Sequence, residues 1–405
     1  AGGMLKSRYN GNRVTSKYCP LSFAEMPADF INAYVLGSLG ATGASLGACA
    51  SFLYNLRHGI DDIRSGRARV VFVGGAEAPV GPEVMEGYAA MGALATARGL
   101  RQLDGLGEDQ EPDFSRACRP FAQNCGFTIA ESAQMIVLFD DELAMELGAT
   151  MYGAPTEVFV NADGHKKSIS GPGVGNYITM ARALAAVRGI IGEQGVRRGG
   201  MVMAHGTGTP QNRVSEAAIL SQTAAAFGIE DWPVAAVKCF LGHSIGTAAG
   251  DQINATLGAW HYGLVPGIST IDEIADDVTQ EHLAFRREHR AVDAAEQRYA
   301  IINSKGFGGN NASAALMSPA ATGAMLQARY SQQDWKRWQQ ANESVVQRQH
   351  DFDQAMTAGT HELIYRFDHG VLGDQDIEVG PGELTLGGKK VQLPQGTPYA
   401  DMRID

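Results

Sequence analysis

Three glycine-rich segments each carry one residue that can do chemistry: Cys49, His205 and His243. Cys49 lies in GASLGACASFLYNL, after a glycine-containing turn and at the start of a predicted helix. The free N–H groups and partial positive charge of a helix N-terminus stabilise a thiolate, so the position predicts an activated nucleophile. A small buried core residue is the alternative interpretation of this segment.

The two histidines occupy similar places in the chain. His205, in MAHGTGTP, and His243, in KCFLGHSIGTAAG, both follow predicted strands, where α/β sheets collect their functional residues. The small residues around each would let a substrate approach the backbone, although a structural histidine is the alternative for either one. Lys238 lies near the end of an apolar strand and needs a carboxylate partner, for which Glu131 in CGFTIAES is the best candidate.

A fourth segment, NSKGFGGNNASAAL at residues 303–316, is a glycine-rich loop between two predicted strands. Phosphate-binding glycine loops need a following helix, and none is predicted here. The other use of such a loop is to aim a backbone N–H into an active site as half of an oxyanion hole.

The elements that must position these residues alternate between strand and helix, which indicates an α/β protein. Residues 97–120 are charged and show no periodicity, so they are predicted as loop, and 319–405 differ in character and are predicted as a separate tail with Trp335 and Trp338 on one helical face. Helices are predicted at 50–65, 177–193, 214–227 and 246–262; strands at 69–78, 132–141, 155–164, 199–210, 233–240, 298–309 and 312–318; and short β segments in the tail at 362–370 and 377–393.

Composition limits the class of protein. The 405 residues carry a net charge of −11, with 44% hydrophobic and 19% charged residues, which is typical of a globular chain and argues against a nucleic-acid binder. No apolar run approaches the about 20 residues of a membrane span, and the first residues, AGGMLKSRYNGNR, contain no apolar h-region, so they are not expected to be a secretory signal. Five cysteines without CxxC spacing fit neither a disulfide framework nor a zinc site, so a reducing, cytoplasmic setting is expected.

Together the four segments resemble a known family, the β-ketoacyl-ACP synthases of the KAS I/II type in the thiolase superfamily. HGTGTP, KCFLGH and GFGG follow Cys49 in the order and approximate spacing of that family. The resemblance covers about residues 28–317 and extends to GRARVVFVGGAEA, to RPF followed by GFTIAES, and to GTAAGDQ. The C-terminal extension resembles that of a bacterial long-form subclass.

The resemblance implies a thiolase-like α-β-α-β-α fold. We expect the remainder of an N-terminal half with the nucleophile at 1–140, a C-terminal half with both histidines at 141–318, and a helical and β tail at 319–405. Only 48 residues precede Cys49, whereas the family has well over a hundred, so the N-terminal half is expected to be incomplete in this chain.

The implied reaction is a decarboxylative Claisen condensation in fatty-acid biosynthesis. Cys49 would take an acyl group from acetyl-CoA or an acyl-ACP, and the backbone N–H groups of Cys49 and Phe307 would form its oxyanion hole. His205 and His243 would bind the thioester carbonyl of malonyl-ACP and stabilise the enolate. No metal or cofactor is expected. Acyl carrier protein and a second copy of the chain are the implied partners.

Supporting roles follow from the same resemblance. Lys238, paired with Glu131, would orient the histidine region, and Phe307 matches the family's gating aromatic. The predicted substrate-binding residues are Thr207 and Thr209, which match the threonines that bond the pantetheine amides, with Gly306 and Gly308.

The chain also departs from the family pattern. Asn124 and Cys125 stand where an Asp usually precedes the GF pair, GEG has become AES at 130–132, and Arg213 replaces an acidic residue. Gly92 replaces an arginine used for docking the carrier protein, and the alternatives for that contact are Arg98, Arg101, Arg197 and Arg198.

Other functions remain open at this point. A ketosynthase of a polyketide or polyunsaturated fatty-acid pathway would have the same catalytic residues. A non-catalytic chain-length-factor-like subunit would lack the nucleophile, and a biosynthetic thiolase would have a Cys–His–Cys set. The acyl donor is open too, although the long-form resemblance favours short acyl groups.

Overall fold

The computed structural model describes residues 7–16, 23–168, 171–362, 364–365 and 367–404. The chain divides into two compact units. The first contains residues 43–360 and the residues up to 27, and the second contains 28–42 with 361–405. The predicted catalytic residues all lie in the first unit. None of the described helices is long and apolar enough to cross a lipid bilayer.

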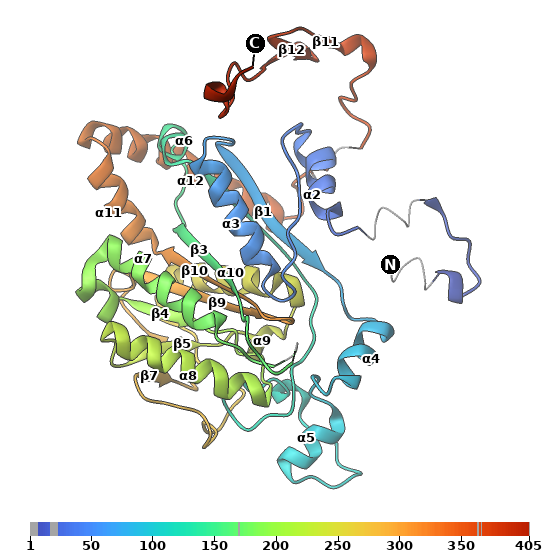
Figure 1. Cartoon of the computed structure of the whole chain (residues 1–405), viewed down its shortest axis with the longest axis vertical. Helices are drawn as coiled ribbons and strands as arrows, with labels where there is room; N and C mark the ends of the chain where they lie inside the picture. Colours follow the sequence, from blue (N-terminus) through green and yellow to red (C-terminus); the bar gives the residue numbers. More distant parts are fainter. Residues whose placement is uncertain (1–6, 17–22, 169–170, 363, 366, 405) are drawn as a thin grey trace. The chain divides into compact units, whose positions relative to one another are not determined.

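A six-stranded mixed sheet forms the centre of the first unit (Figure 1). Its strand order is β3-β10-β9-β4-β5-β7. The strands are β3 (Ala154–Ala162), β4 (Gly200–Met203), β5 (Trp232–Ala235), β7 (Leu283–Phe285), β9 (Tyr299–Gly306) and β10 (Asn310–Met317). Strands β9, β4, β5 and β7 run parallel, whereas β10 is antiparallel to both of its neighbours.

Helices cover both faces of this sheet. Alternate side chains of a strand point to opposite faces, so Val202 joins the core beneath α7 and α8 while Met201 and Met203 join the core beneath α3 and α10. Figure 1 shows α7 and α8 side by side. The bounds are α3 (Ser51–Arg64), α7 (Gly175–Arg198), α8 (Pro210–Phe227) and α10 (Ala248–Tyr262), and all four predicted helices are confirmed.

A second, two-stranded sheet packs against the far side of α3. Its antiparallel strands are β1 (Val70–Glu77) and β2 (Ser132–Phe139). Val73 and Leu138 are buried toward α3, whereas Phe72 and Val137 on the other face are about two-fifths exposed. The two strands predicted at 69–78 and 132–141 are confirmed. The layer order α7/α8, sheet, α3/α10, sheet corresponds to four of the five layers of the predicted α-β-α-β-α fold.

The connection between β1 and β2 contains two helices that the sequence pattern did not predict. They are α4 (Pro82–Ala90) and α5 (Ala97–Asp104). The expectation of a loop over 97–120 is wrong at α5, because Thr96 caps that helix and Gly105 ends it in a left-handed conformation. A helix of eight residues with one buried residue, Leu100, leaves too few apolar repeats to reveal a period.

Short elements complete the first unit. Lys238 opens a helical turn, α9 (Lys238–Leu241), because β5 ends at Ala235; the expectation that a strand runs over 233–240 is therefore wrong at its second half. The others are α6 (Asp141–Leu147), β6 (Leu264–Val265), β8 (Arg290–Ala291), and the 3-10 turns η4 (Phe114–Arg116) and η5 (Ile245–Thr247).

The helical part of the tail belongs to the first unit. It consists of α11 (Pro319–Arg329) and α12 (Gln332–Thr357), which Ser331 separates by capping the second helix. The rings of Trp335 and Trp338 lie 4.6 Å apart. The Trp338 indole N–H donates a hydrogen bond to the carbonyl of Ala149 at 3.1 Å, so this tryptophan packs on its own chain.

The second unit is small. Its three-stranded antiparallel sheet has strands β11 (Ile377–Val379), β12 (Glu383–Leu386) and β13 (Lys389–Gln392), which confirms the β segment predicted at 377–393. The described residues of 362–370 contain no strand, so that prediction is wrong there. Its other elements are α2 (Met26–Phe30), which begins at the boundary with the first unit, the π-helix η3 (Ile31–Leu36), and the turns η6 (Asp374–Asp376) and η7 (Ala400–Met402).

Candidate active site

Cys49 lies in a tight turn directly before α3. Ala48 has a left-handed backbone with φ +51°, and the Gly47 N–H is held by the Ser51 hydroxyl at 2.9 Å. A Cβ on Gly47 would stand 2.6 Å from the ring of Tyr54, so only glycine fits there. These constraints place the Cys49 side chain in the interior, where the residue is 6% exposed.

The hairpin between β9 and β10 is pressed against this turn. The Ser304 hydroxyl donates a hydrogen bond to the Cys49 carbonyl at 2.8 Å. A Cβ on Gly306 would stand 2.1 Å from the Gly47 carbonyl oxygen, so the two backbones approach as closely as glycine allows. This contact brings the backbone N–H of Phe307, at the tip of the hairpin, to the sulfur of Cys49.

The thiol of Cys49 is not activated by its position alone. Burial raises its pKa to about 11. The positive charge of Lys238 and the backbone N–H groups of Phe307 and Cys49 lower the pKa but do not outweigh burial. The expectation of a thiolate stabilised at a helix N-terminus is therefore wrong for this structure, because desolvation is the larger effect.

His205 and His243 lie together in the interior. Their rings are 5.4 Å apart and perpendicular, and the residues are 4% and 1% exposed. Burial first, and then the charge of Lys238, hold the pKa of both imidazoles well below the usual value of 6.5. Both rings are thus neutral at pH 7. In the described part of the chain neither Nδ1 atom has a hydrogen-bond partner.

Lys238 lies at the centre of the site. Its charge acts on the pKa of Cys49, His205 and His243, so the structure brings the three predicted catalytic side chains into one cluster. The Lys238 ammonium donates a hydrogen bond to the His205 carbonyl at 2.7 Å.

The predicted pairing of Lys238 with Glu131 is wrong. Glu131 is exposed, and its carboxylate accepts the Val80 N–H at 3.3 Å. The carboxylate that favours the charged form of Lys238 is Glu216, which is fully buried on α8. Burial lowers the pKa of Lys238, and Glu216 is the largest opposing influence.

Glu216 is a functional residue that the sequence analysis missed. Each of its carboxylate oxygens accepts two hydrogen bonds, one of them from the turn that carries His205. The donors to Oε1 are His205 N at 2.7 Å and Asn303 Nδ2 at 2.7 Å, and those to Oε2 are Gly206 N at 2.9 Å and Asn212 Nδ2 at 2.9 Å. The available signal was an acidic residue in the otherwise apolar run VSEAAIL.

Lys305 is a second missed residue. It precedes Gly306 in the hairpin, and its ammonium donates a hydrogen bond to the Ser215 hydroxyl at 3.1 Å. Its charge joins that of Lys238 in lowering the pKa of His205, and burial lowers the pKa of Lys305 itself. The signal was a lysine within the glycine-rich segment NSKGFGG.

The predicted substrate-binding residues lie beside these groups. The hydroxyls of Thr207 and Thr209 are 3.1 Å apart in the turn after His205. Gly308 lies in the hairpin tip with φ +90°, a conformation that side chains rarely adopt. Gly306 contacts the nucleophile turn, as described above.

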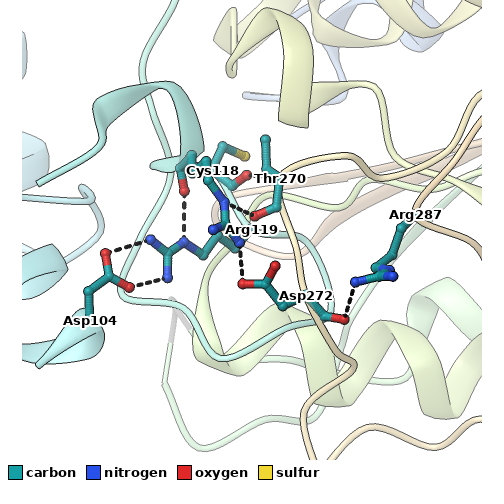
Figure 2. A network of polar contacts seen from close by, with 7 residues as sticks. Asp104, Cys118, Arg119, Thr270, Asp272 and Arg287 are labelled. Carbon is teal, nitrogen blue, oxygen red and sulfur yellow. Dashed lines mark hydrogen bonds and ion pairs between the residues drawn. The ribbon is translucent and has the colours of Figure 1, made fainter.

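A polar network lies around Cys118 and Arg119 (Figure 2), and it reaches the Thr207 turn through the Cys118 sulfur. The Arg119 guanidinium pairs with both carboxylate oxygens of Asp104 on α5, at 2.6 and 2.8 Å. The Thr270 hydroxyl donates to the Cys118 carbonyl at 2.6 Å, and the Cys118 sulfur lies 3.7 Å from the carbonyl of Thr207. Arg287 holds the neighbouring Asp272 carbonyl at 3.1 Å. The network therefore ties α5 and the 270–272 segment to the site.

A layered α/β fold with a buried cysteine, two neutral histidines and a glycine-rich hairpin defines a thiolase-like enzyme fold. Two family models match the chain: the β-ketoacyl synthase N-terminal domain over residues 7–144 and the β-ketoacyl synthase C-terminal domain over 152–272. The chain belongs to the β-ketoacyl synthase family.

Among curated relatives, the β-ketoacyl-[acyl-carrier-protein] synthase FabY of Pseudomonas aeruginosa is 51% identical over 387 residues, which cover 96% of this chain and 60% of FabY. The crystal structure of P. aeruginosa FabY matches with a TM-score of 0.95 and 49% identity, over 100% of this chain and 63% of the FabY chain. The 3-oxoacyl-[acyl-carrier-protein] synthase 2 of Vibrio cholerae is 28% identical, over 74% of this chain and 68% of its own length. The chain thus spans about 60% of the length of FabY.

Proposed function

We propose that the protein is a β-ketoacyl-ACP synthase that condenses an acyl thioester with malonyl-ACP in fatty-acid biosynthesis. The observation that carries this proposal is the cluster of Cys49, His205 and His243 around Lys238, with the backbone N–H groups of Phe307 and Cys49 directed at the sulfur. The names of the relatives FabY and 3-oxoacyl-[acyl-carrier-protein] synthase 2 agree with this activity.

In the first half-reaction the Cys49 sulfur attacks the carbonyl carbon of the donor thioester. A new C–S bond forms, and negative charge develops on the carbonyl oxygen, where the N–H groups of Phe307 and Cys49 stabilise it. The intermediate collapses with cleavage of the donor C–S bond. The departing thiolate takes up the proton that Cys49 releases, which leaves an acyl-Cys49 thioester.

In the second half-reaction a malonyl thioester loses CO2. The electron pair of the broken C–C bond passes into an enolate. The enolate oxygen accepts hydrogen bonds from the N–H groups of His205 and His243. Each neutral imidazole carries one N–H group, and that N–H is the donor available to the enolate oxygen. The enolate carbon attacks acyl-Cys49, forms the new C–C bond and breaks the C–S bond to Cys49. The expelled Cys49 thiolate takes a proton from water.

The remaining residues position these groups. We assign Lys238 and Glu216 to holding the His205 turn, and Thr207 and Thr209 to binding the pantetheine amides of the substrate. The hairpin glycines Gly306 and Gly308 would shape the path of the arm, and Phe307 would gate it.

Acyl carrier protein, as free partner and as malonyl-ACP, and acetyl-CoA or an acyl-ACP are the proposed substrates and partners. A homodimer in the cytoplasm is part of the same proposal and rests on the family resemblance and the cysteine pattern. Arg98 and Arg101 on α5 are candidates for the contact with an acidic carrier protein. A ketosynthase of a polyketide or polyunsaturated fatty-acid pathway is the alternative with the same chemistry.

The test is the variant Cys49→Ala in the intact protein. We expect no acyl-enzyme in mass spectrometry after incubation with acyl thioester, and no condensation product with malonyl-ACP, while the circular dichroism spectrum is unchanged. Full condensing activity in a folded Cys49→Ala protein would overturn the proposal. An active wild type whose acyl adduct maps to another residue would overturn the assignment of the nucleophile.

A further inference from the structure

One backbone segment, residues 122–130, connects the two histidine regions; we call it the strap. The Gly126 N–H donates a hydrogen bond to the Gly208 carbonyl at 3.1 Å, in the turn that follows His205. At its other end the strap exchanges two hydrogen bonds with His243: His243 N to the Thr128 carbonyl at 2.7 Å, and Ala130 N to the His243 carbonyl at 3.0 Å. The position of one histidine relative to the other therefore depends on this strap.

The strap also contacts the ring of His243. The Phe127 ring meets the imidazole edge-on, with centroids 5.2 Å apart. Phe127 is 5% exposed, so it closes that side of the imidazole against water. A shift of the strap would move the imidazole and admit solvent to it.

Arg213 anchors the start of the strap. It lies in the first turn of α8 and is 8% exposed. Its Nη1 donates to the Asn124 side-chain oxygen at 3.1 Å and to the Ala122 carbonyl at 3.4 Å. Its Nε and Nη2 donate to the two oxygens of Asp277 at 2.9 and 2.8 Å, which balances the buried charge.

Arg213, which stands where the resembled family usually has an acidic residue, contacts Asn124, one of the two residues before the GF pair. The Arg213 guanidinium donates a hydrogen bond to the Asn124 amide oxygen, while the Asn124 amide N–H donates to the Arg119 carbonyl at 3.0 Å. Arg213 and Asn124 therefore belong to one hydrogen-bonded arrangement.

We propose that Arg213 is a positioning residue that sets the geometry of the two histidines through the strap. The inference rests on the proposed condensing function. Helix α8 holds both histidine regions. Glu216 binds the His205 turn directly, and Arg213, three residues earlier, binds the strap that is hydrogen-bonded to the backbone of His243. Loss of Arg213 leaves the Asn124 oxygen buried without its donor, whereas Asp277 is half exposed and can be hydrated.

The experiment compares Arg213→Met and Arg213→Lys in the intact protein. For Arg213→Met we expect kcat for condensation to fall by roughly 100-fold with little change in KM, because a small displacement of a catalytic group costs about that much. Alkylation of Cys49 by iodoacetamide should keep its rate. NMR titration should show the pKa of His243 rising toward its usual value as water reaches the ring. Arg213→Lys keeps the charge and one donor, and it should recover part of kcat.

Arg69→Met is the matched control, because Arg69 also pairs with both oxygens of one carboxylate, Asp140, but lies directly before β1. It should leave kcat and the histidine titration unchanged. The inference would be overturned if Arg213→Met kept the wild-type kcat and the wild-type pKa of His243. It would also be overturned if the rates of Cys49 alkylation and of condensation fell by the same factor. Absence of condensation in the wild type would overturn the proposed function instead, and the histidine titration would still decide the role of Arg213.

Discussion

The two sides of the site are held by different means. On the nucleophile side, main chain meets main chain: Gly306 lies against the Gly47 carbonyl, and a backbone N–H reaches the sulfur of Cys49. On the histidine side, buried polar side chains hold the backbone: the carboxylate of Glu216 binds two N–H groups of the His205 turn, and Lys238 binds its carbonyl.

The difference predicts different sensitivities. A backbone contact tolerates no added atom, whereas a side-chain network tolerates changes of shape but not of charge. The nucleophile side should therefore respond most strongly to added volume, and the histidine side to lost charge.

The largest effect is expected for Gly306→Ala. The added methyl would stand 2.1 Å from the Gly47 oxygen, so the hairpin must move away and remove the Phe307 N–H from the sulfur. We expect acylation of Cys49 to fall at least about 100-fold, measured as acyl-enzyme formed per unit time. Gly258→Ala on α10 is the control, because its methyl would meet no atom within 4 Å. Equal acylation rates in the two variants would refute the claim that the contact between the Gly306 and Gly47 backbones positions the Phe307 N–H.

The next effect is expected for Glu216→Gln, which keeps the shape and removes the charge. Lys238 loses its counter-charge, and an amide N–H must face backbone donors, so the free energy of unfolding should fall by about 3 kcal/mol. The rate of condensation should fall more than the rate of Cys49 alkylation. The measurements are denaturant unfolding, the condensation rate and the alkylation rate. Glu193→Gln, at an exposed pair with Arg197, is the control and should change stability by less than about 1 kcal/mol. An unchanged free energy of unfolding in Glu216→Gln would contradict the account based on charge.

The smallest effect, taken for a single histidine, is the response of stability to pH. Burial holds the pKa of His205 and His243 well below 6.5, so below pH 6.5 the unfolded chain binds protons that the native site does not. Stability from these groups is thus present above pH 6.5 and lost as the pH falls, by up to about 1.4 kcal/mol per pH unit for each histidine. Denaturant unfolding between pH 7.5 and 5 measures it. His243→Gln should reduce the slope, and an unchanged slope would contradict neutral burial of that ring.

Local motifs made the elements around the site predictable. Helix α3 after Cys49, the strands before His205 and the hairpin around Phe307 all follow from apolar periods and glycine turns that lie within about 15 residues of sequence. The family, the layered fold and the cluster of Cys49, His205 and His243 were accessible for this reason. The roles assigned to these residues stay predictions until the variants are measured.

Contacts between distant segments were not predictable in the same way. Glu131 and Glu216 are both acidic residues near catalytic motifs, and only the packing of α8 under the His205 turn decides which one serves Lys238. The pKa of Cys49 was misjudged because a helix N-terminus is visible in sequence, whereas the depth of burial that outweighs it is not.

The left-handed backbone of Ala48 has a consequence for how the site could be monitored. A non-glycine residue in this conformation costs about 1–2 kcal/mol, and a short peptide would relax out of it. The turn keeps its shape because α3 and the hairpin from residues 304–309, more than 250 positions later, enclose it. The reactivity of a single sulfur atom is therefore a reporter of tertiary structure, since it depends on both ends of the compact unit being folded together.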